Sequence, residues 1–298
     1  MSKGSLFWAN ASGKLGETVL YRSGGEQRTR TYVAKIKNPK TLAQMQNRLS
    51  MRNFAGVYRS LKGILSVSFP NRAAKESGFN AFVKVNKSIN TPVVTKEGAL
   101  AGLSVPYNML LSQGYLTQFG EFKHQTINQT TRGMFNLSGH PNYGEIRSYY
   151  SQNMKESTIN SLENLTALYN KLQLPQNANI TIVTAEYADE GFAVSSQTIN
   201  LKSSDQVLSS MERPLVIGGS DSLDDDVVMT LMLKGSGSGE VMNSIIISWT
   251  DASGKLQVTN SRMCVFSDNL EFAEQFVKGG DVYEQVLQQY GYNEGATL

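Results

Sequence analysis

Basic residues are concentrated in the first third of this chain, whereas the remainder is acidic. Residues 1–96 hold 17 lysines and arginines against three acidic residues, a net charge of +14, and residues 97–298 hold 11 basic and 22 acidic residues, a net charge of −11. A charge asymmetry between two parts of a chain indicates a nucleic acid, an anionic surface or an acidic protein partner, including a second copy of the same chain. The alternative is that the two parts carry solvated surfaces whose charges differ without any functional reason.

The composition excludes several classes of protein. The chain has 298 residues, 40% hydrophobic and 18% charged, so it can bury a sizeable core and is comfortable as two domains. Its single cysteine, Cys264, cannot form an intramolecular disulfide, and with only two histidines it cannot supply a zinc site of the usual Cys/His kind. No segment has the ~18 apolar residues of a membrane helix, and the first residues lack the apolar core of a signal peptide. We expect a soluble intracellular product without membrane, metal or cofactor.

The first 36 residues have the pattern of short strands separated by glycine turns. Residues 18–22 and 27–33 are rich in β-branched and aromatic residues, and Gly24-Gly25 between them tolerates positive φ, which predicts a β-hairpin. Alternation along the second strand places Arg28, Arg30 and Tyr32 on one face. The pattern therefore predicts a basic sheet face with an aromatic ring beside it.

Helical signals follow. Asn38-Pro39 and the pair Thr41 and Gln44 are typical of a helix N-terminus. In the helix that begins here, a stripe of four basic residues lies beside a broad apolar surface. The stripe consists of Arg48, Arg52, Arg59 and Lys62. A second helix is predicted for residues 71–87, after which the composition shifts. We therefore predict a basic hairpin-and-helix domain, residues 1–92, and an acidic β-rich domain, residues 93–298, with a C-terminal helix.

The second part is rich in Ser, Thr, Asn and Gln and has the turn spacing of an all-β region. Predicted strands cover residues 116–122, 133–137, 180–187, 192–201, 227–233, 244–249, 256–259 and 262–266, and predicted helices cover residues 155–172 and 269–290. The fold class predicted for the chain is α+β: an N-terminal β-hairpin and two-helix module, followed by a mainly antiparallel β-sandwich-like region with helical insertions.

Two segments near the N-terminus carry a family resemblance. Gly13 to Tyr21 has the pattern G-K-x-G-x-x-V-x-Y, and Asn38 to Arg48 approximates N-P-[KR]-T-x-x-Q-x-x-R with its arginine one position later. Together with Arg28 and Arg30 these segments resemble an uncharacterised group of proteins from gut Bacteroidetes and the bacteriophages that infect them. The resemblance covers under a third of the chain and implies a virion or prophage structural protein. It implies no catalytic residue.

Other motifs favour structural roles. The acidic run Asp221–Asp226 lacks the ligand spacing of a calcium loop, and a solvated turn is the better interpretation, although cation binding stays open. His124 and His140 are interpreted as structural or surface residues, and Cys264, in a predicted strand, as a buried inert thiol. Glu186 with Asp189 or Glu190 could be proposed as paired catalytic acids, but acids this close together more often face solvent. We do not expect an enzyme.

Two functions from different classes remain. The first is a self-assembling phage or viral structural protein, such as a capsid, head-tail ring or tail component, located in the virion and in the host cytoplasm during assembly. Its partners would be further copies of this chain, other virion proteins and the phage genome. The second is a nucleic-acid-binding accessory protein without sequence specificity. The residues predicted to contact nucleic acid or neighbouring subunits are Arg22, Arg28, Arg30, Lys35, Lys37, Lys40, Arg48, Arg52, Arg59 and Lys62, with Tyr21 and Tyr32 as stacking candidates.

Overall fold

The computed structural model describes residues 12–23, 26–34, 41–89, 92–127, 130–149, 156–221, 227–234, 241–265 and 274–292. The chain divides into two compact units: residues 1–41 with 294–298, and residues 42–293. We call the first the N-terminal unit and the second the main unit. Within the described residues, no helix is both long and apolar enough to cross a membrane.

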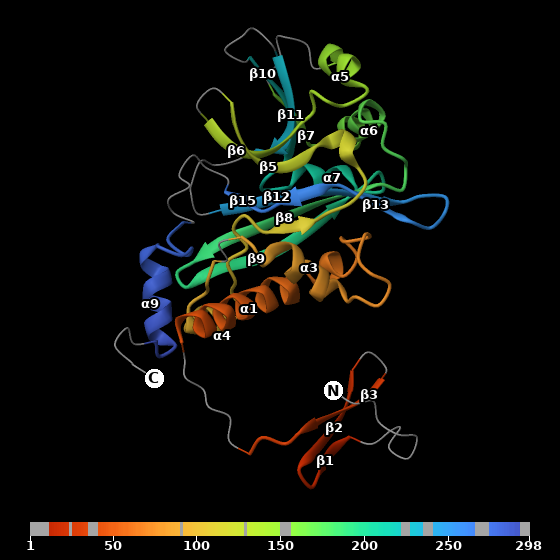
Figure 1. Cartoon of the computed structure of the whole chain (residues 1–298). Helices are drawn as coiled ribbons and strands as arrows, with labels where there is room; N and C mark the ends of the chain where they lie inside the picture. Colours follow the sequence, from red (N-terminus) through yellow and green to blue (C-terminus); the bar gives the residue numbers. More distant parts are fainter. Residues whose placement is uncertain are drawn as a thin grey trace. The chain divides into compact units, whose positions relative to one another are not determined.

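The N-terminal unit contains a three-stranded antiparallel sheet in the order β1-β2-β3 (Figure 1). Its strands are β1 (Gly13–Leu15), β2 (Thr18–Ser23) and β3 (Glu26–Thr31). Leu15 pairs with Thr18 across a two-residue turn in which Gly16 has a φ of 59°, a conformation that favours glycine. The predicted hairpin of β2 and β3 is present, with Ser23 opposite Glu26.

All helices among the described residues belong to the main unit. They are α1 (Leu42–Ser60), α2 (Lys62–Leu65), α3 (Gly78–Asn86), α4 (Lys96–Leu100), the 3₁₀ turn η2 (Thr117–Phe119), α5 (Tyr143–Tyr149), α6 (Leu162–Lys171), α7 (Asp205–Ser209) and α9 (Asp281–Gln289). Serine or threonine side chains cap several of them; Ser77 accepts a hydrogen bond from the backbone N–H of Asn80, and Thr95 from that of Gly98.

Its strands form two sheets. They are β4 (Leu110–Ser112), β5 (Glu121–Ile127), β6 (Thr130–Asn136), β7 (Glu156–Ile159), β8 (Asn179–Ala188), β9 (Gly191–Ile199), β10 (Leu215–Asp221), β11 (Val227–Leu233), β12 (Val241–Thr250), β13 (Leu256–Val258), β14 (Asn260–Arg262) and β15 (Cys264–Val265). The seven-stranded sheet has the order β4-β14-β5-β6-β11-β10-β7. The five-stranded sheet has the order β13-β12-β8-β9, with β15 also paired to β12.

The two sheets share one hydrophobic core. Alternate residues of β8 and β12, such as Ile180 and Ile245, are buried in the same cluster as Phe135 of β6 and Leu231 of β11. Helix α6 contributes Leu165 to this cluster. Because pairing is antiparallel except between β14 and β5, the α+β class with mainly antiparallel sheets predicted from the sequence is confirmed.

Helices cover the other face of the five-stranded sheet (Figure 1). The opposite residues of β8, Val183 and Ala185, are buried with Phe54 of α1 and Phe82 of α3 in a second cluster. The main unit is therefore layered, with α1 and α3 on the five-stranded sheet and that sheet on the seven-stranded one. A third cluster joins α9 to the first half of α1 through Met45 and Leu287.

The unit boundary lies at residue 41 and not at residue 92 as the composition suggested. Helices α1 and α3 belong to the main unit because their apolar faces complete the core of the five-stranded sheet. The side chain of Asn86 in α3 is also buried, and it accepts a hydrogen bond from Leu110 N and donates one to Leu110 O, at 2.7 and 2.9 Å. Charge and packing thus divide the chain at different places.

Several predicted elements also change in extent. The segment predicted as one helix, residues 155–172, contains β7 and then α6, since residues 156–159 pair with β10 and Ser161 caps the helix. The predicted strand 116–122 begins as η2, and the predicted strand 262–266 is divided between β14 and β15 by Met263, which bonds to Met109. Helix α3 begins only at Gly78, seven residues later than predicted, and the predicted helix 269–290 is confirmed for Asp281–Gln289.

Candidate functional site: a basic face of the N-terminal sheet

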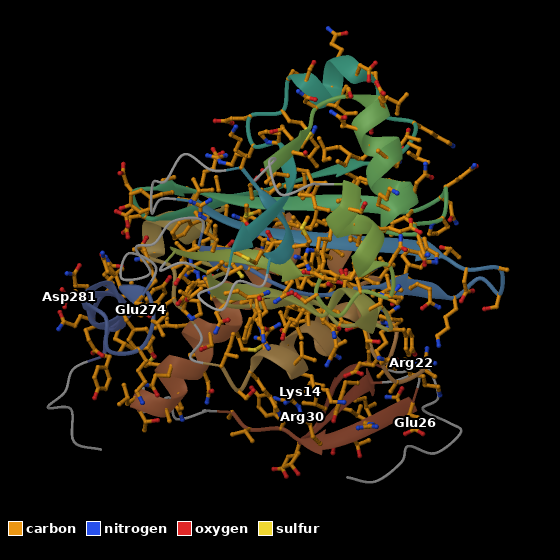
Figure 2. All side chains as sticks on the ribbon, turned by 90° about the horizontal axis from the view of Figure 1, so that it is seen from above. Lys14, Arg22, Glu26, Arg30, Glu274 and Asp281 are labelled. Atoms are coloured by element: carbon orange, nitrogen blue, oxygen red, sulfur yellow. The ribbon has the colours of Figure 1, made fainter. Side chains whose placement is uncertain are left out.

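One face of the N-terminal sheet gathers cations from its two outer strands. Lys14 of β1 lies opposite Val19 of β2, which in turn lies opposite Arg30 of β3, so the three residues form one row across the sheet. The next row on this face pairs Tyr21 with Arg28. Side chains two residues apart along a strand share a face, and Figure 2 shows Lys14 and Arg30 together on this sheet. We call Lys14, Tyr21, Arg28, Arg30 and Tyr32 the basic face.

Each of two cations lies over an aromatic ring of this face. Lys14 Nζ is 3.6 Å from the centroid of the Tyr32 ring, and Arg30 Cζ is 5.8 Å from that of Tyr21. The negative face of an aromatic ring attracts a cation, and such contacts at exposed sites contribute about 0.5–1 kcal/mol. The rings therefore hold the two side chains over the sheet while leaving the charges accessible to an anionic partner.

The basic face holds one carboxylate among its cations. Glu26 Oε2 is 3.7 Å from a guanidinium nitrogen of Arg28, and both side chains are substantially exposed. An exposed ion pair of this length adds little stability. Three cations against one carboxylate leave this face positively charged.

Arg22 lies on the opposite face. It alternates with Tyr21 on β2 and shares its face with Leu20, the one buried hydrophobic residue among the described residues of the N-terminal unit. Leu15, with about half of its surface exposed, lies on this face as well. The sequence grouped Arg22 with Arg28 and Arg30, but the strand alternation separates them.

The other predicted contact residues belong to different parts of the chain. Arg48, Arg52 and Arg59 lie on α1 and Lys62 lies on α2, all in the main unit. Arg52 is half-buried over the ring of Tyr290, 5.1 Å from its centroid. Lys35, Lys37 and Lys40 lie outside the described residues. The seven predicted cations that the structure describes are thus divided between two compact units.

Sequence reasoning missed the contribution of Lys14 to this site. It occurs in the G-K-x-G segment but was not assigned as a contact residue, because the predicted hairpin did not include β1. The Gly16 turn after Leu15 was the available signal, since a two-residue glycine turn joins paired strands.

His124, His140 and Cys264 are wholly or partly buried in the main unit. His124 Nε2 accepts a hydrogen bond from Val265 N at 2.8 Å, and burial lowers the pKa of His124 to about 4. His140 Nδ1 accepts from Asn142 N at 3.2 Å, and burial lowers its pKa too. Burial raises the pKa of the Cys264 thiol, which favours the neutral thiol over the nucleophilic thiolate.

The described residues contain no further site with a chemical motif. Glu186 pairs with Arg213 at 2.7 Å rather than with a second carboxylate. No cluster of three His, Cys, Asp or Glu residues within the described ranges could hold a metal ion. Of the acidic run 221–226, residues 222–226 lie outside those ranges. An open cavity of about 580 Å³ beside α9 is lined by Glu274, Asp281 and Lys278 among others, and Figure 2 shows both acids at α9.

Comparisons with protein-family models, with curated proteins and with solved structures find no match to this chain.

Proposed function

We propose that this chain is a self-assembling structural subunit of a phage or viral particle, and that its N-terminal unit is an arm that binds the acidic surface of a neighbouring subunit. The main support is that the N-terminal unit has almost no hydrophobic core of its own. Among its described residues only Leu20 is a buried hydrophobic residue. A small sheet needs a hydrophobic face or a packing partner to be stable. A partner surface that covers this sheet would supply the packing contacts that the N-terminal unit does not form by itself.

The distribution of charge supports the same contact. Residues 1–41 hold eight basic and two acidic residues, whereas residues 42–293 hold 20 basic and 22 acidic residues. Opposite net charges on two parts of one chain favour repeated contacts between identical copies, because every copy presents both surfaces. Such head-to-tail contacts form rings when the rotation closes and filaments when it does not. The particle and, during assembly, the host cytoplasm are the proposed locations, and other virion proteins are the further partners.

Light scattering coupled to size exclusion tests the arm. The double variant Lys14→Glu, Arg30→Glu reverses two charges of the basic face, whereas Arg22→Glu is a matched control on the opposite face. We expect salt-sensitive oligomers from the native chain that become smaller in high salt, since a Debye length of about 3 Å at 1 M screens exposed charges. The double variant should lose them, and the control should keep them after nuclease treatment. A native chain that is monomeric at all concentrations and salts contradicts the proposal.

Nucleic acid is the second candidate partner. Lys14, Arg28 and Arg30 share one face with two tyrosine rings, and phosphate-binding cations beside aromatic rings are typical of single-strand binding surfaces. Anisotropy of a labelled single strand in a salt series would show a slope of log K against log[salt] of about −0.7 per phosphate, hence about −2 for three contacts. Salt-independent binding, or no binding, rules this candidate out.

A further inference from the structure

Strand β9 forms an open edge of the five-stranded sheet. It pairs with β8 through an unbroken register from Ile180 opposite Ile199 to Ala188 opposite Gly191. On its other side, the only described contact of its backbone is near the start, where Phe192 and Ser104 exchange two hydrogen bonds of 3.0 Å each. Beyond that bridge, residues 195–198 are exposed.

The bridge to Ser104 shows which backbone groups point outward. Because the groups of Phe192 point away from β8 and strand geometry alternates, the groups of Val194, Ser196 and Thr198 also point away from β8. Among the described residues, none of these three N–H and three C=O groups has a hydrogen-bond partner. Six aligned, unpaired backbone groups are a template for another strand.

This edge lacks the features with which folded proteins usually prevent edge pairing. Charged residues, prolines, bulges and very short strands are the common devices. β9 has nine residues and no charge, no proline and no break in register. The other described edges differ: β3 carries Glu26, Arg28 and Arg30, and β1, β4, β7, β13 and β15 have only two to four residues.

We infer that β9 pairs antiparallel with β9 of a second copy of this chain, about a two-fold axis at Ser196. The free edge runs from residue 193 to residue 199, so its midpoint is Ser196. An antiparallel pair centred there places Ser196 opposite Ser196 and Val194 opposite Thr198 of the other copy. Each of these pairs exchanges two hydrogen bonds, which satisfies all six outward groups. The result is one continuous sheet across the two copies.

The absence of charge along the edge favours a second copy as the occupant. Residues 193–199 are all uncharged, so the two-fold axis brings no like charges together. The bridge between Phe192 and Ser104 occupies the edge before residue 193, so pairing between the two copies is confined to residues 193–199. Within that length, the antiparallel orientation satisfies the six outward groups of each copy.

Ser196→Cys tests the register directly in the full chain. Residues directly opposite in a hydrogen-bonded antiparallel pair have Cα atoms about 5.5 Å apart, within the 4.4–6.8 Å range of disulfides. We expect a covalent dimer on mild oxidation or with a short bismaleimide. Gln206→Cys, on an exposed position of α7, is the matched control and should stay monomeric on a denaturing gel. The native Cys264 is buried and does not interfere.

Charge variants provide an independent readout. Ser196→Lys and Ser196→Glu each place like charges opposite one another and should weaken self-association by about fivefold. Mixing the two variants should restore it as a heterodimer, which sedimentation velocity detects. Gln206→Lys should have no effect. If Ser196→Cys fails to cross-link with both reagents and the charge variants associate like the native chain, the inference is overturned.

This contact rests on the proposed self-assembly only in needing a second copy, and the two can fail separately. Salt-sensitive oligomers that depend on Lys14 and Arg30 but do not cross-link at residue 196 would refute the β9 contact alone. Cross-linking at residue 196 without an effect of the Lys14 and Arg30 variants would refute the arm alone. A native chain that is monomeric under all conditions would refute both.

Discussion

The side chain of Asn53 pairs with the backbone of Val105 as a strand would, donating to its C=O at 2.8 Å and accepting from its N–H at 2.9 Å. The same amide also donates to the C=O of Pro92 at 2.7 Å. Asn53 is fully buried in the middle of α1. Asn86 of α3 makes the corresponding pair with Leu110, so each of the two helices is attached to the segment 105–110 by one buried asparagine.

Replacing Asn53 should therefore destabilise the main unit. Asn53→Ala leaves the N–H and C=O of Val105 and the C=O of Pro92 without their partners, and we expect the free energy of unfolding to fall by about 2–4 kcal/mol. Urea unfolding followed by circular dichroism measures it. Asn47→Ala, at an exposed position of the same helix, should change it by less than about 0.5 kcal/mol. Equal effects of the two substitutions would contradict the role assigned to Asn53.

Acid should weaken the main unit through His124. Its pKa is lowered to about 4 in the folded protein by burial, whereas an unfolded histidine titrates near 6.5. The unfolded state binds the proton first, so the stabilisation is present above pH 6.5 and is lost as the pH falls toward 4. The loss amounts to about 2–3 kcal/mol.

Two measurements check the titration of His124. Its imidazole proton resonances should show no protonation above about pH 5. The variant His124→Gln, which retains an acceptor for Val265 N, should have a flatter dependence of stability on pH between 6.5 and 4. A His124 that titrates near 6.5 in the folded protein would disprove the prediction.

Two truncations distinguish the compact units from the division suggested by charge. A chain that begins at Leu42 keeps all four hydrophobic clusters, because the one buried hydrophobic residue that it loses, Leu20, belongs to none of them. It should unfold cooperatively and near the melting temperature of the full chain. A chain that begins at Val93 lacks α1 and α3, exposes one face of the five-stranded sheet and should not fold. Calorimetry compares them, and cooperative unfolding of the shorter chain would restore the boundary at residue 92.

A glycine in β6 is required by close packing. A Cβ at Gly133 would lie 2.5 Å from the Cβ of Cys264 and 2.9 Å from a ring carbon of Phe122. Gly133→Ala should therefore cost about 1–3 kcal/mol through overpacking. Gly139→Ala, with no atom within 4 Å of the added carbon, is the control and should be neutral by the same thermal unfolding measurement.

The sequence predicts local structure well where one periodicity governs a segment. Strands β8, β9, β11 and β12 lie close to where segments with β-branched and apolar residues, bounded by Gly, Asp or Ser turns, predict them, and the hairpin of β2 and β3 lies where its glycines predict it. Elements that depend on pairing with a distant segment are not predicted in this way. Ile159 fits the apolar spacing of the helix that follows, but residues 156–159 form strand β7 because β10 pairs with them.

The candidate site could be predicted from the sequence only where it depends on alternation within one strand. Alternation along one strand places Arg28 and Arg30 together, but the addition of Lys14 depends on the pairing of β1, and the exclusion of Arg22 depends on its phase in β2. The boundary at residue 41 depends on the buried faces of α1 and α3, which a charge count does not detect.

Strand β14 lies between β4 and β5 in the seven-stranded sheet, although about 140 residues of chain separate it from both. During synthesis this sheet consequently stays incomplete until residue 262 has left the ribosome. Until then, the edges of β4 and β5 that will pair with β14 have no partner strand. Contacts so distant in sequence form slowly, and open edges expose a nascent chain to association with others. The yield of folded protein in an expressing cell should accordingly rise with chaperone supply and with slower translation.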